Sequence, residues 1–290
     1  MNKDNKQIKQ KPDAWSDFDR MTGKLSVSWD EPKEEIWQRM APQLARPASR
    51  PTRILWMRPA FRLAVAAMLV LLMATGTFIR FYRVSVETGV GQQQLVTLPD
   101  GSIIQLNAGS SLNYYPYWWA FSRELAFNGE GYFEVEKGRR FSVVSAKGTT
   151  TVLGTSFTVF ARETAYRVAC LTGKVKVADA SGQHEVVLEP NQKVAWQEGG
   201  FLKTEAKPAE ETAWTRNQFL FTGTPIQEVF DEIERQYGVQ ISHSLLADFE
   251  YAGNFSRELS VEEVLNYVCK PFNLKFEKLG SKQYRVIKNE

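Results

Sequence analysis

Hydrophobic positions along the 290-residue chain follow different patterns in different segments, and the longest uninterrupted pattern lies near residue 70. Leu63–Ile79 contains no charged residue and is bounded by Arg62 and Arg80. A helix of this length reaches about 25 Å, enough to cross a bilayer when the flanking arginines extend toward the headgroups. A core helix would carry a polar stripe, and a cleaved signal peptide would lie at the N-terminus. We therefore predict a transmembrane helix over 61–82.

The span contains one weak point near its far end. Thr75, Gly76 and Thr77 are poor helix formers compared with the leucines before them. Their presence favours local unwinding near this end of the helix.

Beyond the span, apolar and polar residues alternate in short runs separated by turn residues. This period of two is typical of half-buried strands. Pro99-Asp100-Gly101 separates two such runs and predicts a hairpin, whereas Gly129-Glu130-Gly131 predicts a tight turn. We expect an all-β domain over 84–200, a sandwich, a barrel or a β-helix-like stack. Its strands are predicted at 94–98, 102–106, 111–115, 124–127, 132–136, 141–144, 150–153, 156–160, 166–171, 174–177, 185–188 and 193–196.

The period changes after a linker predicted at 201–213. Two helical patterns follow, one opened by Thr224-Pro225-Ile226-Gln227 and one by Ser260-Val261-Glu262-Glu263, and both read as capping boxes. The first helix is predicted to end at Gly238 and the second at Pro271. With strands at 218–221, 239–242, 251–255, 274–278 and 283–287, residues 214–290 are predicted to form a small α+β domain of order β-α-β-β-α-β-β.

The segment before the span, residues 1–60, is polar and lysine-rich at its start and holds one amphipathic stretch. Asp30 and Pro32 can open a helix that Pro42 should end or kink, and 45–52 reads as a linker. Its apolar stripe has no domain to pack on, which favours a helix-in-groove contact over a membrane-surface helix or a spacer. The stripe consists of Ile36, Trp37, Met40 and Leu44.

Charge orients the span. The net charge is only +3, and the basic residues concentrate beside the apolar run, so a diffuse nucleic-acid-binding surface is not indicated. The N-terminal flank carries Arg46, Arg50, Arg53, Arg58 and Arg62, against Arg80 and Arg83 on the other side. The positive-inside rule therefore predicts a cytoplasmic N-terminus and an exported C-terminal part.

Few residues suggest catalysis. His184 lies in a predicted turn, and His243 follows a predicted strand. The two cysteines, Cys170 and Cys269, are predicted to be buried thiols. The zinc, redox and serine-hydrolase motifs are missing, and Glu134 and Glu136 read as the solvent face of a strand. We predict no enzymatic activity, no cofactor and no metal site.

An aromatic run, 114–121, is interrupted by Pro116. We expect a loop that covers core edges, with a partner contact, either a sugar or the membrane surface, as the alternative. A membrane-tethered module that binds carbohydrate or another envelope component is thus an alternative function.

Residues 94–196 contain four motifs that follow one another in order. They consist of Leu98, Pro99, Asp100, Gly101 and Ser102, followed by Leu106 and Asn107; Arg123, Leu125, Phe127, Gly129, Glu130, Tyr132, Phe133 and Val135; Gly154, Thr155, Phe157 and Val159; and Gly173 to Val177. Together these motifs resemble those of FecR-type membrane anti-sigma factors. Two positions depart from the family pattern, since Gly131 stands where alanine is usual and Asn191 where glycine is usual.

This resemblance implies a function in signalling at the bacterial inner membrane. The cytoplasmic tail would bind an extracytoplasmic-function sigma factor, through Ile36, Trp37, Met40 and Leu44 in our reading, without touching nucleic acid itself. The periplasmic part would sense the signalling domain of a TonB-dependent outer-membrane transporter, and membrane proteases would act during release. The C-terminal unit is similar to the secretin and TonB short N-terminal domain.

Overall fold

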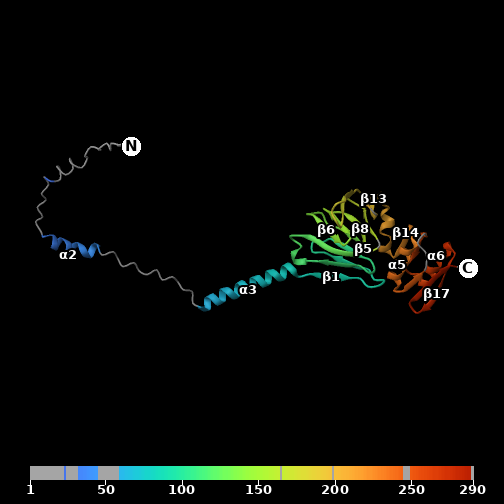
Figure 1. The fold of residues 1–290 in the computed structure, drawn as a ribbon, viewed down its shortest axis with the longest axis horizontal. Helices are drawn as coiled ribbons and strands as arrows, with labels where there is room; N and C mark the ends of the chain where they lie inside the picture. Colours follow the sequence, from blue (N-terminus) through green and yellow to red (C-terminus); the bar gives the residue numbers. More distant parts are fainter. Residues whose placement is uncertain are drawn as a thin grey trace, which may run out of the picture. The chain divides into compact units, whose positions relative to one another are not determined.

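The computed structural model describes residues 23, 32–44, 59–163, 165–197, 199–243 and 249–288 (Figure 1). Several predictions lie outside these residues: the polar segment 1–29, the helix start at Asp30 and the linker at 45–52. The flanking arginines 46, 50, 53 and 58 lie outside them too.

The amphipathic stretch forms helix α2, Lys33–Leu44. Pro42 lies inside this helix and does not end it, so of the two expected effects, an end or a kink, the end is not observed. The reason is its position in the last turn, where a proline removes only one backbone hydrogen bond before the helix stops two residues later.

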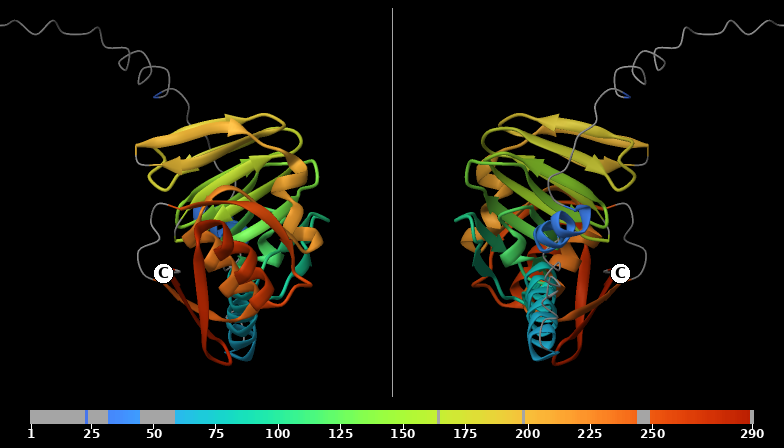
Figure 2. Two further views of the ribbon diagram at one scale, coloured as in Figure 1. Left: turned by 90° about the vertical axis from the view of Figure 1, so that its right-hand side faces the viewer. Right: turned by 90° about the vertical axis from the view of Figure 1, so that its left-hand side faces the viewer.

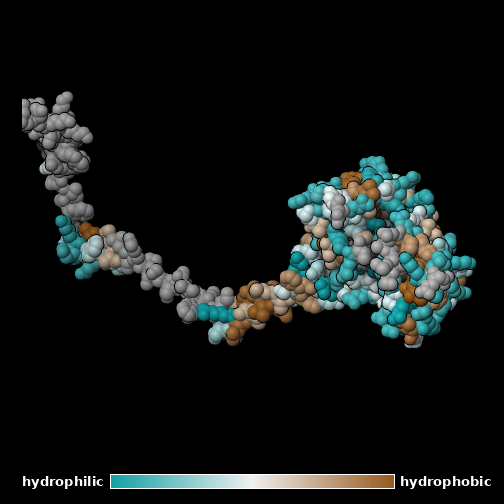
Figure 3. Space-filling view, turned by 45° about the vertical axis from the view of Figure 1, so that its right-hand side comes forward, coloured by the Kyte–Doolittle hydropathy of each residue, from teal (hydrophilic) through white to brown (hydrophobic). Residues whose placement is uncertain are grey.

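The apolar run forms helix α3, Pro59–Phe81, which is long and apolar enough to cross a membrane. None of its residues is buried, and in Figure 3 most of its surface has the brown colour of hydrophobic residues, with hydrophilic residues near its start. The helix runs unbroken through Gly76, and the Thr77 hydroxyl donates to the Met73 carbonyl at 2.8 Å. The predicted weak point is therefore helical in this structure.

Thirteen of the described strands form a β domain of two sheets that share the long strand β5, Arg123–Glu134. The first half of β5 pairs with β4 and β6, and the second half with β3 and β8. One sheet contains β1 (Val84–Glu87), β4 (Ser111–Tyr114), β6 (Phe141–Ser145), β7 (Gly148–Val152), β10 (Val175–Asp179) and β11 (Glu185–Leu188). The other contains β2 (Gln94–Thr97), β3 (Ile103–Leu106), β8 (Ser156–Ala161), β9 (Tyr166–Cys170), β12 (Gln192–Gln197) and β13 (Gly200–Glu205).

The two sheets enclose a single core. Leu125 and Val177 from one sheet and Phe133 and Val168 from the other belong to the same buried cluster. Among the described strands of this domain every pairing is antiparallel except that of β5 with β6, so two sheets over one core form a sandwich and not a β-helix-like stack of parallel strands. Figure 2 shows the stacked green and yellow strands of this sandwich domain from two sides.

Strand β5 corrects the prediction of a tight turn at 129–131, because the structure has one continuous strand there. Gly129 has a φ of 119° and lies against Ser110, whose Cα would be 2.6 Å from an added Cβ. Glycine thus lets the strand bend and approach a neighbouring backbone while it passes from one sheet to the other.

The segment predicted as a linker, 201–213, is also structured. Strand β13 pairs along its whole length with β12, and helix α4, Pro208–Glu211, follows it. Positions 202–205 of this strand are all exposed, so the segment lacks the alternation of buried and exposed residues by which a strand is predicted, and its composition alone suggested a linker.

The C-terminal domain has its own core and the expected order of elements. A short 3₁₀ helix, η2 (Ala213–Arg216), leads into β14 (Gln218–Pro225), α5 (Ile226–Tyr237), β15 (Gln240–His243), β16 (Glu250–Ser256), α6 (Val261–Cys269), η3 (Lys270–Phe272), β17 (Leu274–Gly280) and β18 (Gln283–Lys288). Strands β14 and β16 pair with each other, and β15, β18 and β17 form a second sheet.

One of the two predicted capping boxes is present. Ser260 accepts a hydrogen bond from the Glu263 amide, and the Glu263 side chain accepts one from the Ser260 amide. The box at Thr224 is wrong, because β14 continues through Thr224 to Pro225, which is the residue before the first helical one and has no side-chain cap. Pairing with β16 therefore takes precedence over helix capping at this position.

Candidate functional site

The first family motif holds the sandwich domain together through a charged pair. Asp100, in the turn between β2 and β3, accepts a 2.6 Å hydrogen bond from Arg123 Nε at the start of β5. Arg123 is 7% exposed and also donates to the carbonyls of Glu136 and Arg139, at 2.9 and 2.7 Å. Ser102 donates to Asp100 at 3.0 Å, so the motif fastens three segments to one another.

This pairing controls the protonation of Asp100. Partial burial alone would raise the pKa of the carboxyl, but hydrogen bonds from Arg123 and Ser102 outweigh it and hold the pKa below its usual value. Asp100 is therefore ionised throughout the physiological pH range, and its function in this structure is structural.

The second motif has two faces. Phe133 points into the core of the sandwich, whereas Glu130 and Tyr132 alternate to the outer face of β5. Tyr132 packs against the core of the C-terminal domain. The second motif, which the sequence assigns to the sandwich domain, thus also contributes to the junction with the C-terminal domain.

Asn107 is the centre of that junction. It is fully buried, its amide donates to Glu130 at 2.7 Å, and its carbonyl oxygen accepts from Gln236 of α5 at 2.9 Å. Gln236 in turn donates to Glu232 at 2.7 Å, and Arg235 donates to Glu232 at 2.8 and 3.0 Å. Side chains from β5, the end of β3 and α5 thus form one buried polar network.

Glu130 and Glu232 lie close enough to influence each other. Burial raises the pKa of Glu130, and the neighbouring Glu232 raises it further, against the opposing effects of Arg162, Asn107 and Arg167. Burial, with help from Arg235, lowers the pKa of the Arg162 guanidinium. The junction therefore concentrates charge in a setting where charge is costly.

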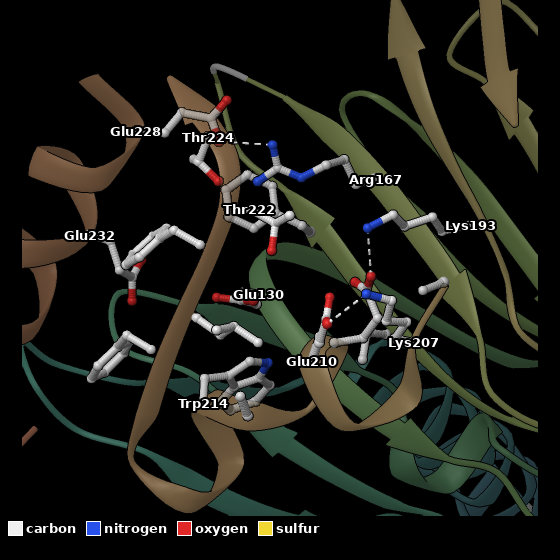
Figure 4. Close-up of a pocket in the computed structure, with 18 of the residues that line it drawn as sticks. Glu130, Arg167, Lys193, Lys207, Glu210, Trp214, Thr222, Thr224, Glu228 and Glu232 are labelled. Carbon is white, nitrogen blue, oxygen red and sulfur yellow. Dashed lines mark hydrogen bonds and ion pairs between the residues drawn. The ribbon is translucent and has the colours of Figure 1, made fainter. Parts of the chain in front are cut away.

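Beside this network lies a cavity of about 480 Å³ between β14, the outer face of β8, β9 and β12, and helix α4 (Figure 4). Arg167 of β9 crosses it to Glu228 of α5 with a 2.8 Å ion pair. Lys193 pairs with Glu211 at 2.8 Å and Lys207 with Glu210 at 3.0 Å. The Arg167–Glu228 pair joins the two domains across the cavity, whereas the other two pairs hold the α4 segment, one to β12 through Lys193 and one within the segment through Lys207.

Trp214 lines the same cavity. It is 5% exposed, and its indole N–H has no hydrogen-bond partner among the described residues. Its backbone carbonyl accepts from Gln93 at 2.8 Å, which adds another bond between the two domains.

The described residues give little support to a metal site or to reactive histidines or thiols. They contain no group of three or more histidine, cysteine or acidic side chains that could hold a metal ion. His184 lies 3.3 Å from Asp179, and His243 packs on Phe230. Cys170 and Cys269 are free, buried thiols, as predicted, and burial raises the pKa of each to about 11.

Comparison with known proteins gives a family match for each of the two segments that form this junction. Residues 84–176 match the family described as FecR protein, and residues 218–286 match the one described as FecR, C-terminal; together they make up more than half of the chain. The chain belongs to the FecR family. Both matched segments of this FecR chain contribute to the Asn107 network, the first through Asn107 and Glu130 and the second through Glu232 and Gln236.

Two solved structures are similar to this FecR chain. Both are crystal structures of a proposed anti-sigma factor from Parabacteroides distasonis ATCC 8503, at 2.50 and 1.65 Å resolution. Each is 27% identical in sequence, with a TM-score of 0.66, and the matches cover 72% and 71% of this chain and 100% of those chains. No curated protein matches the sequence.

The structure brings together some of the residues that the sequence singled out and separates others. Asp100, Ser102 and Arg123 meet, and so do Asn107 and Glu130. Sequence reasoning missed Glu232, Arg235 and Gln236 as functional positions, although charged and amide side chains on the buried face of an amphipathic helix were a usable signal. The tail residues Ile36, Trp37, Met40 and Leu44 all lie on α2, and their contact with a partner stays a prediction.

Proposed function

We propose that this FecR-family protein is a single-pass inner-membrane anti-sigma factor that relays a signal from outside the membrane to transcription. Helix α3 crosses the bilayer with the N-terminus in the cytoplasm. The tail sequesters an extracytoplasmic-function sigma factor, and the periplasmic sandwich and C-terminal domains respond to the signalling domain of a TonB-dependent outer-membrane transporter. The protein does no catalysis itself, and membrane proteases act on it during release.

The observation that carries the proposal is the presence of both FecR segments behind a membrane-length helix, in a fold similar to that of a proposed anti-sigma factor. A regulator of this kind needs a partner-binding element before the helix. Helix α2 has the required character, because Trp37 is 64% exposed and Met40 is 44% exposed. Apolar side chains with this much exposed surface are costly in water unless a partner covers them.

The sigma-factor contact is tested by Trp37→Ala in the full chain. Large aromatic anchors contribute about 2 kcal/mol or more to many interfaces, so the substitution should reduce co-purification of the cognate sigma factor at least tenfold. Gln38→Ala, one residue along the same helix and also exposed, is the matched control. Equal sigma-factor recovery with Trp37→Ala and with the unchanged chain would contradict the assignment.

The C-terminal domain supplies the surface for the transporter's signalling domain. Among the described strands, β17 pairs only with β18, which leaves an edge open to strand addition. Leu279 on β17 is 49% exposed, and Leu279→Asp should weaken binding of the purified signalling domain to the full chain by about tenfold, the cost of a charge placed against an apolar partner.

Val187→Asp provides the control for this experiment. Val187 is 50% exposed, is also apolar, and lies on β11 of the sandwich domain. If the two variants bind the signalling domain equally well, the docking surface does not lie on β17. Loss of binding only in the Leu279 variant would support docking at β17.

A further inference from the structure

The connection between β4 and β5 carries several aromatic side chains, of which only Trp119 belongs to the core of the sandwich domain. Trp119 is buried, and its ring packs edge-on against Tyr114 and Phe141, each with a centroid distance of 5.7 Å. Tyr117 and Phe121, on either side of it, are 55% and 69% exposed. Trp119 therefore fixes the loop to the sandwich while its neighbours project outward, and such a group of exposed rings indicates an interaction surface.

This group continues directly onto the end of α3. The ring of Tyr117 lies 5.3 Å from that of Tyr82 and 6.2 Å from that of Phe78, centroid to centroid. The guanidinium carbon of Arg80 lies 4.8 Å from the centre of the Trp118 ring, a cation–π contact. The loop thus touches the last turn of the helix at several points.

These contacts fix the depth of the loop relative to the apolar run. Phe78 is among its last residues and Arg80 is the first charge beyond it. A spanning helix places that transition at the boundary between the acyl chains and the headgroups, where tyrosine and tryptophan are enriched and arginine reaches toward phosphate. Because Tyr117 lies beside Phe78, it lies at this boundary as well.

We propose that residues 115–121 form a membrane-interface loop that seats the sandwich domain on the outer surface of the bilayer, with Tyr117, Trp118 and Phe121 among the lipids. Lipid fits better than a sugar, because Arg80 lies 4.8 Å from the Trp118 ring centre and the Phe121 ring 4.6 Å, so little of that ring is left for stacking on a glycan. Arg139 also donates to the Ala120 carbonyl, which holds the loop in place.

This seat has a consequence for signalling. A domain joined to a helix only through its chain could turn freely, whereas one held by ring contacts and by lipid keeps a defined orientation. Movement of the sandwich domain is then conveyed to the outer end of α3. The inference rests on the proposed crossing of the bilayer by α3, and the experiment separates the two.

The experiment uses the full chain reconstituted in phosphatidylcholine nanodiscs, with one nitroxide spin label for each variant. Labels are attached at Phe121→Cys in the loop, at Val70→Cys in the middle of α3 and at Leu153→Cys, a control of similar exposure on the sandwich (69%, 66% and 64%). Both native thiols are buried with a pKa of about 11, so labelling at neutral pH is confined to the introduced cysteine. Collision rates with oxygen, which enters lipid, and with a water-soluble nickel complex report depth.

The expected result is a ratio of oxygen to nickel collisions that is highest at 70, intermediate at 121 and lowest at 153. A ratio at 121 equal to that at 153, with a high ratio at 70, would overturn the seat and leave the spanning helix intact. A low ratio at 70 would overturn the span itself. Protection of 121 from both probes would also overturn the proposal, because it would point to a contact with a second copy of the chain.

Discussion

At the scale of single residues, Glu130 shows how the junction between the domains couples stability to pH. Its pKa is raised by burial and by Glu232, with Arg162, Asn107 and Arg167 acting against them. A carboxyl with a raised pKa stabilises the fold fully below its unfolded pKa, and this contribution is lost as pH rises through the folded value. The junction should therefore become less stable as the pH rises toward neutrality.

Glu130→Gln tests this coupling. The amide oxygen can still accept the hydrogen bond from Asn107 but carries no charge, so the variant should gain free energy of unfolding relative to the unchanged chain at about pH 8 and gain less at about pH 5. Urea unfolding at the two pH values measures the difference. Glu134→Gln, on the exposed end of the same strand, is the control, and equal pH dependence in all three proteins would exclude the coupling.

At the scale of elements, patterns decided by neighbouring residues could be predicted from the sequence and those decided by distant ones could not. The hairpin around Asp100, the Ser260 capping box and the order of the C-terminal elements depend on local alternation and turn chemistry. The bend at Gly129 depends on Ser110, nineteen residues earlier, and the extension of β14 through Thr224 depends on β16. The candidate site could not be predicted for the same reason, because Asn107 accepts a hydrogen bond from Gln236, which lies 129 residues further along the chain.

Helix α3 carries the prediction that belongs to this scale. It is continuous, yet Gly76 lowers helix stability by about 1 kcal/mol relative to alanine, and flanking threonines add to this. If membrane proteases act on the chain as proposed, leucine at 75, 76 and 77 should therefore slow its intramembrane cleavage in cells, as followed by pulse-chase immunoblotting. Ala67→Leu, in the same helix but outside the weak point, should leave cleavage unchanged, and an unaltered rate with all three leucines would remove the weak point from the mechanism.

At the scale of the whole molecule, the question is whether the sandwich and C-terminal domains act as one body. Their cores are separate, but Tyr132 packs from one domain onto the core of the other, and Gln93, Gln105 and Arg167 add polar bonds across the junction. Each of these part-buried hydrogen bonds contributes about 0.5–1.5 kcal/mol alone. Asn107 contributes more, because it is buried and contacts groups of both domains, so its loss would leave several buried polar atoms unpaired.

Asn107→Ala should therefore separate the two domains in their unfolding. A lost buried hydrogen-bonding group costs about 1–3 kcal/mol, and here the cost falls on the junction rather than on either core. Calorimetry of the full chain in detergent micelles should show one cooperative transition that the substitution splits in two, the first at a lower temperature. Asn254→Ala, an exposed asparagine of β16, should leave one transition. If the junction conveys the transporter's signal, Asn107→Ala should also abolish the response of the sigma factor while the tail still binds it; a normal response would show that the signal reaches α3 without this network.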